Sequence, residues 1–181
     1  SVGMAVYDEE TDAEYDLLRR ADLAMYAAKE EGKSKNVSGF QIYTADLSTR
    51  VMREIERQQE LQYAIENKEF FLEYQPIVSL KTGRIRGLEA LVRWQHPERG
   101  VVPPSDFIPF AESTGFIVPI GEQVIESACR QFNEWMGVEQ ETLWLSINVS
   151  AAQLVHGDLI AVVRRCLDEH AIDPTRLKFE I

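Results

Sequence analysis

The chain has 181 residues, enough for one domain or for parts of two, and its 45% hydrophobic and 27% charged residues are typical of a soluble globular protein. The formal net charge of −11 argues against a broad basic surface for nucleic acid polymers, although a metal site or one arginine can still bind a small anionic nucleotide. No apolar run reaches the roughly 18 residues of a membrane helix, and no signal peptide opens the chain. We therefore expect a cytoplasmic segment without membrane contact.

The first third of the chain predicts a strand and two helices. Residues 1–7 have the pattern of a short buried strand, and Thr11 to Glu14 form a capping box for a helix that Gly32 can end. A second, charged helix is predicted from Asp46 to Asn67, with an apolar stripe interrupted by glutamines. We interpret this helix as a connector, and its packing partner is not determined by the pattern.

Two strands are predicted next. Residues 70–80 form the first, and Pro76 within it favours an edge, a bulge or a strand end. Residues 86–94, R-G-L-E-A-L-V-R-W, alternate strictly, so that Glu89, Leu91 and Arg93 share one face and apolar residues occupy the other. An amphipathic strand whose charged face meets water is the simplest interpretation of this stretch taken alone.

The remainder alternates helices and strands. We predict a loop over 96–104, helices over 105–112, 119–136 and 151–170, and strands over 143–150 and 177–181. Gly115 is expected to end the first of these helices. Strands and helices that alternate at this spacing indicate an α/β fold with parallel strands.

Three oxygen-bearing side chains have the same phase on three predicted strands. If these strands are neighbours, Glu89, Asn148 and Glu180 share a face. Two carboxylates and a carboxamide suit Mg²⁺, Mn²⁺ or Ca²⁺ and give no reason to expect zinc. A structural salt bridge of Glu89 is the alternative, but its partner is not Arg93, because four residues of extended chain separate the two by about 13 Å.

The cysteines and histidines form no recognisable site. Cys129 and Cys166 lack a C-x-x-C spacing, and we interpret them as buried free thiols of a reducing cytoplasm, with one disulfide as the alternative. His96, His156 and His170 form no ligand pair. We expect these histidines to be structural or exposed to solvent.

Four ordered motifs resemble the first half of an EAL domain. They are Y-Q-P-I-V-S-L at 74–80, G-L-E-A-L-V-R-W at 87–94, I-N-V-S at 147–150 and L-K-F-E-I at 177–181. That family contains bacterial phosphodiesterases that hydrolyse cyclic di-GMP, and its fold is a modified (β/α)₈ barrel, similar to a TIM barrel, with one antiparallel strand. The resemblance implies a catalytic two-metal site for Mg²⁺ or Mn²⁺.

The same resemblance implies a role for individual residues. Glu89, Asn148 and Glu180 would bind metal, with Glu89 as the catalytic glutamate of the motif. Three residues would contact the dinucleotide: Gln75 a guanine, Leu91 the ligand surface and Arg93 a phosphate. The metal site is incomplete in this chain, since the family's D-D-F-G-T-G aspartates and a later lysine and glutamate are absent from it.

The beginning of the chain resembles the last strand and helix of a GGDEF domain, the diguanylate cyclase fold. The resemblance rests on S-V-G-M-A and on R-A-D-L-A-M-Y-A-A-K-E-E-G-K-S-K-N. Lys29 and Lys33 stand where that family has a lysine and an arginine that contact nucleotide, and Lys33 lacks the fork of an arginine. A solvated basic helix end explains both lysines, so we expect no cyclase activity of this chain.

These observations predict three segments: a GGDEF remnant over 1–43, a connecting helix over 44–68 and the first half of an EAL domain over 69–181. We expect a parent signalling protein that hydrolyses cyclic di-GMP to linear pGpG, forms a homodimer and can be anchored to a membrane through another region. The alternatives are an inactive EAL domain that binds cyclic di-GMP as a receptor, or a protein-interaction module. The chain alone is expected neither to close a barrel nor to show appreciable activity, since the fourth strand is its last.

Overall fold

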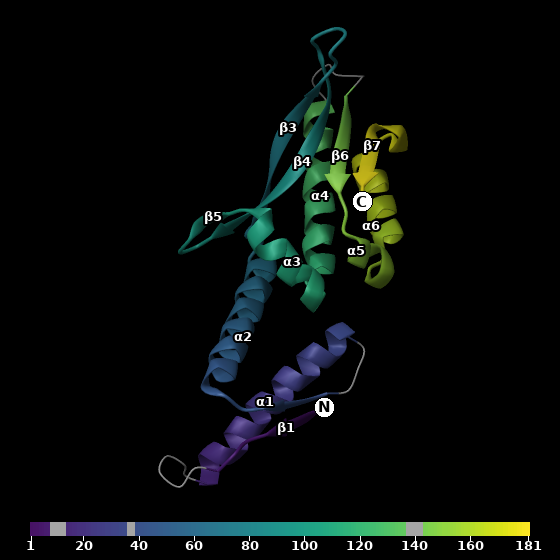
Figure 1. Cartoon of the computed structure of the whole chain (residues 1–181). Helices are drawn as coiled ribbons and strands as arrows, with labels where there is room; N and C mark the ends of the chain where they lie inside the picture. Colours follow the sequence, from purple (N-terminus) through teal and green to yellow (C-terminus); the bar gives the residue numbers. More distant parts are fainter. Residues whose placement is uncertain (8–13, 36–38, 137–142) are drawn as a thin grey trace. The chain divides into compact units, whose positions relative to one another are not determined.

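The computed structural model describes residues 1–7, 14–35, 39–136 and 143–181. It contains two compact units, Ser1–Glu60 and Leu61–Ile181, which are coloured from purple to blue and from blue to yellow in Figure 1. A long helix, α2 (Ala45–Glu66), contributes to both units. The predicted division at residues 43 and 68 remains a prediction.

The first unit contains a βαβ arrangement. Strands β1 (Val2–Met4) and β2 (Phe40–Ile42) pair in parallel, and helix α1 (Glu14–Lys35) connects them. A small apolar core joins α1 to the first half of α2 and consists of Ala24, Ala27, Leu47 and Val51. The parallel pair with a helical connection is the expected local topology of an α/β fold.

Two predictions for this unit are wrong. The first strand is short and not buried: only Gly3 packs closely, since a Cβ there would lie 2.1 Å from the Ala21 carbonyl oxygen, and Val2 is 57% exposed. Helix α1 continues past Gly32 to Lys35, because a single glycine costs a helix only about 1 kcal/mol. Residues 11–13 of the proposed capping box lie outside the described residues.

The second unit is built on a five-stranded sheet. Strands β3 (Phe70–Val78), β4 (Ile85–His96), β6 (Trp144–Asn148) and β7 (Leu177–Glu180) are ordered β3-β4-β6-β7, and β5 (Gly100–Val102) pairs with the end of β4. Strand β3 is antiparallel to β4, whereas β4, β6 and β7 are parallel. Strand β5 also pairs antiparallel with β4. The α/β class and the antiparallel strand β3 beside parallel strands agree with the EAL expectation, and Pro76 lies on an edge strand, as predicted. The sheet is open, with β3 and β7 at its ends.

Helices cover one face of this sheet. They are α3 (Pro104–Thr114), α4 (Ile117–Met136), α5 (Ala151–His156) and α6 (Leu159–His170), and a 3-10 turn, Pro174–Arg176, precedes β7. Figure 1 shows α4 running along the strands, and its apolar residues meet buried Ala90 and Trp94 of β4 in one core. The opposite faces of β4, β6 and β7 therefore carry the polar residues. No helix in the described part of the chain has the length and apolar character that crossing a membrane requires.

Three helix boundaries and one loop can be compared with the predictions. Gly115 ends α3 in the left-handed region at φ 84°, as predicted. The single helix predicted over 151–170 is wrong, because Gly157 is extended and Asp158 caps a new helix by accepting from Ala161 N at 3.1 Å. The loop predicted over 96–104 contains β5 instead.

The C-terminal end of α2 is part of the second unit. Leu61 and Ala64 are buried in its core, at 1% and 0% exposure. Gln123 of α4 donates from Nε2 to the Ile65 carbonyl oxygen at 2.7 Å, which satisfies one of the acceptors left at a helix end. Trp94 Nε1 donates to Glu69 Oε2 at 2.9 Å just beyond this helix end. The end of α2 is thus held by packing and hydrogen bonds together.

Candidate active site

Strand pairing places the three predicted metal ligands on one sheet face. Glu89 is opposite Ser146, and Asn148 is opposite Glu180. Since Ser146 and Asn148 are two residues apart on β6, all four side chains lie on the same side of the sheet, away from α4. The predicted common face of Glu89, Asn148 and Glu180 is confirmed.

The middle strand supplies a hydrogen-bond donor to each carboxylate. Asn148 Nδ2 donates to Glu89 Oε1 at 2.8 Å, and the Ser146 hydroxyl donates to Glu180 Oε1. Strands β4 and β7 flank β6 and are therefore about 10 Å apart, so both glutamates lean toward β6. Ser146, which is fully buried, had no role in the sequence-based site, although its phase placed it on this face.

The side chains of this cluster fit a hard cation in part. Glu89 and Glu180 offer carboxylate oxygens, and Asn148 retains Oδ1 because its Nδ2 is bonded to Glu89. Such donors, together with water, are typical of Mg²⁺ and Mn²⁺ sites. Within the described ranges, no group of three or more His, Cys, Asp or Glu side chains is assembled. These strands therefore supply two carboxylates and one amide oxygen.

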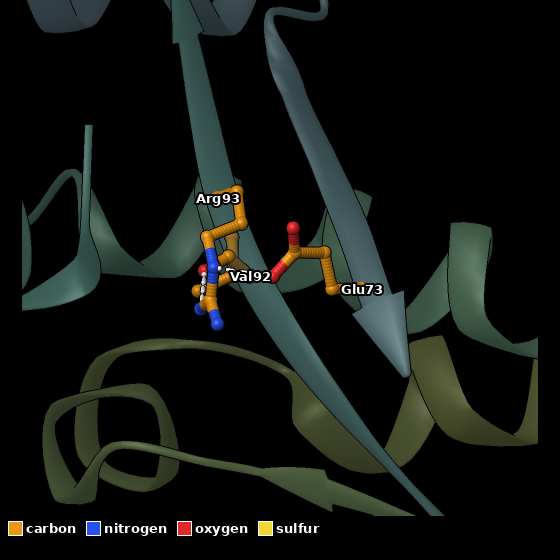
Figure 2. A network of polar contacts seen from close by, with 3 residues as sticks. All are labelled: Glu73, Val92 and Arg93. Carbon is orange, nitrogen blue, oxygen red and sulfur yellow. Dashed lines mark hydrogen bonds and ion pairs between the residues drawn. The ribbon is translucent and has the colours of Figure 1, made fainter. Parts of the chain in front are cut away.

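Arg93 lies on the same face and is held by Glu73 of the neighbouring strand (Figure 2). Arg93 Nε donates to Glu73 Oε2 at 2.8 Å, and Nη1 donates to the Val92 carbonyl oxygen at 2.8 Å. The two side chains are 21% and 55% exposed. Arg93 and Glu89 thus have different partners, as the extended spacing predicted, but the role of Glu73 was missed.

The other two predicted ligand-contacting residues lie between these groups. Gln75 of β3 is directly opposite Glu89, and Leu91 is directly opposite Glu73. Gln75 is exposed and Leu91 is half-buried. Residues directly opposite each other have side chains on the same face, so Gln75 and Leu91 join Glu89 and Arg93 on one continuous surface.

An indole covers the amino-terminal part of this face. Gly87 is opposite Trp144, and a Cβ on Gly87 would lie 2.5 Å from the indole ring. Lys178 Nζ is 3.4 Å from the Trp144 ring centroid, within cation–π distance. The glycine therefore allows Trp144 to cross β4, and the polar side chains lie nearer the carboxyl ends of β6 and β7.

The turn after Asn148 is anchored to helices α3 and α4. Ser150 caps α5: its hydroxyl accepts from Ala152 N at 3.2 Å and donates to Glu112 Oε1 at 2.6 Å. Gln153 Oε1 accepts from Ser150 N at 2.9 Å, which completes a capping box. Gln153 is buried against Gly121, where an added Cβ would lie 1.7 Å from its Nε2. This corner fixes the backbone two residues beyond Asn148.

The sequence-based predictions also concern the cysteines, His96 and the two lysines of α1. Cys129 and Cys166 are free and buried, as predicted, and burial next to Cys166 raises the pKa of Cys129 to about 12. His96 accepts at Nδ1 from the Glu98 and Arg99 amides, both at 3.1 Å, and so supports the turn before β5. Lys29 and Lys33 are one helical turn apart on α1 in the first unit.

Comparison with known proteins identifies the second unit. The EAL domain model matches residues 58–181. The bifunctional diguanylate cyclase/cyclic di-GMP phosphodiesterase MucR of Pseudomonas aeruginosa is 35% identical over 100% of this chain and 26% of its own length. The cyclic di-GMP phosphodiesterase PdeR of Escherichia coli is 38% identical over 93% of this chain and 25% of its own length. The chain thus spans about a quarter of these curated relatives.

Solved structures agree with this match. The PaMucR phosphodiesterase in complex with c-di-GMP is 39% identical, with a TM-score of 0.66 over 70% of this chain and 51% of that chain. The FimX EAL domain from Pseudomonas aeruginosa bound to c-di-GMP is 27% identical, with a TM-score of 0.60 over 68% of this chain and 49% of that chain. The family match covers more than half of the 181 residues, and the chain belongs to the EAL domain family.

Proposed function

We propose that this chain forms part of a cyclic di-GMP phosphodiesterase that hydrolyses one phosphodiester bond to give linear pGpG. The observation that carries the proposal is the contact of Asn148 with Glu89, on the face that also bears Glu180 and Arg93. The names of MucR and PdeR as cyclic di-GMP phosphodiesterases support the same activity. The whole protein's substrate remains part of the proposal, since the matched relatives are about four times longer.

The residues have separable tasks in this reaction. Glu89, Asn148 and Glu180 would hold Mg²⁺ or Mn²⁺, which when bound activates water and stabilises the leaving oxygen. Arg93 donates hydrogen bonds to a phosphate, since a guanidinium suits that geometry. Gln75 donates to and accepts from a guanine edge, and Leu91 packs against the ligand.

A receptor that binds cyclic di-GMP without hydrolysis is the second candidate. The observation that favours it is the surface shared by Gln75, Leu91 and Arg93, which needs no metal to contact the dinucleotide. A metal pair that clamps both the attacking and leaving oxygens needs further ligands. The solved EAL domains that hold c-di-GMP support ligand binding for both candidates.

We further propose that the first unit is the end of a GGDEF domain. The parallel pair of β1 and β2 joined by α1 supports this. So does the match of this whole chain to part of MucR, a relative named as a bifunctional diguanylate cyclase/cyclic di-GMP phosphodiesterase. Lys29 and Lys33 are then remnants of a nucleotide-contacting helix and carry no cyclase activity by themselves.

The test is a hydrolysis assay with Mg²⁺ or Mn²⁺ on a protein extended beyond Ile181 to the length of a complete barrel, roughly 250 residues for the EAL part. Metal-dependent formation of pGpG supports the phosphodiesterase. Binding of cyclic di-GMP without turnover supports the receptor, and absence of binding contradicts both. The 181-residue chain, assayed in parallel, is expected to show no appreciable turnover, because its sheet is open at β7.

A further inference from the structure

We propose that Glu73 is an internal competitor for Arg93 that lowers the affinity of the site for the dinucleotide phosphate. The inference rests on the proposed function, because it concerns how Arg93 receives cyclic di-GMP. Glu73 and Arg93 lie diagonally on adjacent strands, since Glu73 pairs directly with Leu91 and Arg93 is two residues further along β4. Figure 2 shows the two side chains directed toward each other.

The hydrogen bonds of Arg93 show what a phosphate would meet. A guanidinium has five N–H groups and binds an oxyanion best through two parallel bonds from one edge. Nε already donates to Glu73 Oε2 at 2.8 Å, and one Nη1 hydrogen is directed to the Val92 carbonyl oxygen, also at 2.8 Å. The edge formed by Nε and Nη2 is therefore available to phosphate only after Glu73 leaves.

The other edge of the guanidinium does not avoid this competition. A phosphate bound to the remaining Nη1 and Nη2 hydrogens would share Arg93 with the Glu73 carboxylate and would be placed near a like charge. Phosphate binding at either edge therefore has a lower affinity. Binding at the Nε and Nη2 edge breaks the ion pair with Glu73, and binding at the Nη1 and Nη2 edge adds repulsion from the Glu73 carboxylate. A ligand that extends from Gln75 to Arg93 also passes Glu73. Along β3, Glu73 lies between Gln75 and the residue directly opposite Arg93.

Exposure limits the size of the effect. Glu73 is 55% exposed and Arg93 21%, so water weakens their attraction. Removing the competitor should therefore tighten binding by about two- to fivefold at low salt, the range expected for a partly exposed ion pair. The effect should shrink as salt increases, because screening acts on both the ion pair and the repulsion.

The test is titration of cyclic di-GMP into the extended protein in the presence of a chelator, so that no hydrolysis occurs. Glu73→Gln and Glu73→Ala should each tighten binding by about two- to fivefold in 50 mM NaCl, and by less in 500 mM NaCl. Glu126→Gln is the matched control, because Glu126 pairs with Arg165 on α4 and α6 and its replacement changes the net charge equally. This control should leave the affinity unchanged.

A double variant shows whether the effect acts through Arg93. In an Arg93→Ala background, Glu73→Gln should no longer tighten binding. Weaker or unchanged binding by both Glu73 variants would overturn the inference, as would equal tightening with and without Arg93. Failure of the wild-type protein to bind cyclic di-GMP would instead refute the proposed function, so the two failures are distinct.

Discussion

Asn148 Nδ2 donates a hydrogen bond to Glu89 Oε1 over 2.8 Å, linking β6 to β4 at the centre of the polar face. Asn148 is also directly opposite Glu180 on the other flanking strand. It therefore offsets part of the negative charge that the two glutamates bring to this face. Two of the side chains proposed to hold a cation, Glu89 and Asn148, are thus already in contact.

Glu89→Gln is expected to abolish metal-dependent turnover while the fold persists. The glutamine keeps the size of the side chain and an Oε1 that accepts from Asn148, but it loses the carboxylate charge. Mn²⁺ affinity, measured by calorimetry, should fall by more than about tenfold, since even loss of a partner of a metal ligand has that effect. Unchanged Mn²⁺ affinity would remove Glu89 from the proposed metal site.

Ser146→Ala tests the partner of Glu180. Alanine fits the fully buried position, so the unfolding free energy should change little, while Glu180 loses the hydroxyl that orients it. Mn²⁺ affinity should decrease about 10- to 100-fold, the usual effect of losing a residue that orients a metal ligand. Ser105→Ala, which removes a hydroxyl bonded to Asp106 on α3, is the control. Equal affinities of the two variants would contradict the orienting role of Ser146.

Gly121→Ala should destabilise the second unit by about 1–3 kcal/mol, because overpacking displaces neighbouring side chains. The new methyl group would lie 1.7 Å from Gln153 Nε2 and would force Gln153 out of the capping box with Ser150. Denaturant unfolding measures the change. Gly39→Ala, where an added Cβ meets nothing within 4 Å, should change stability much less. A similar loss in both variants would contradict the packing argument.

The fold should lose stability in alkali. Burial raises the pKa of Tyr74 from 10.0 to about 12 and that of Cys129 from 9.0 to about 12. Both groups stay protonated in the folded protein while the unfolded chain loses their protons, so this stability is complete below pH 9 and is lost as the pH rises toward 12. Cys129→Ala should reduce the number of protons released on unfolding, between pH 9 and 11, by up to about one.

The matched control for this pH dependence is Val124→Ala, which also truncates a buried side chain of α4 but removes no titratable group. It should lower the unfolding free energy without changing its slope against pH. A slope that is the same in the wild type and Cys129→Ala would show that this thiol does not contribute to alkaline unfolding.

The faces of the strands could be predicted from the sequence because an extended chain alternates strictly. The alternation therefore predicted the common face of Glu89, Asn148 and Glu180, although it did not show that their strands are neighbours. The contacts of these residues could not be predicted, since they depend on register. Ser146 meets Glu180 across 34 positions of the chain, and Glu73 meets Arg93 only through the antiparallel pairing of β3 with β4.

Local errors have local causes. The break between α5 and α6 had a signal in Gly157 and Asp158, a residue that prefers helix N-caps, but the apolar periodicity on both sides hid it. Gly32 led to the opposite error, the prediction of a helix end where the helix continues. A glycine alone does not end a helix whose flanking residues continue it. Side-chain bonds such as those of His96 that form the β5 turn leave no pattern in the sequence.

Pro76 has a consequence for how this sheet can meet other chains. Gln95 N donates to Glu69 O, so these two residues form a hydrogen-bonded pair of the β3–β4 ladder. Such pairs alternate with pairs that are not hydrogen-bonded. Pro76 and Leu88 form a pair of the second kind, in which the backbone N–H positions point away from the partner strand. The proline thus removes a donor from the outer edge of β3 without weakening its ladder with β4. A foreign strand would find that edge interrupted, whereas the backbone of β7, at the opposite end of the sheet, contains no proline. Intermolecular β-pairing of this chain, and any fibrous aggregation that follows from it, should therefore begin at β7.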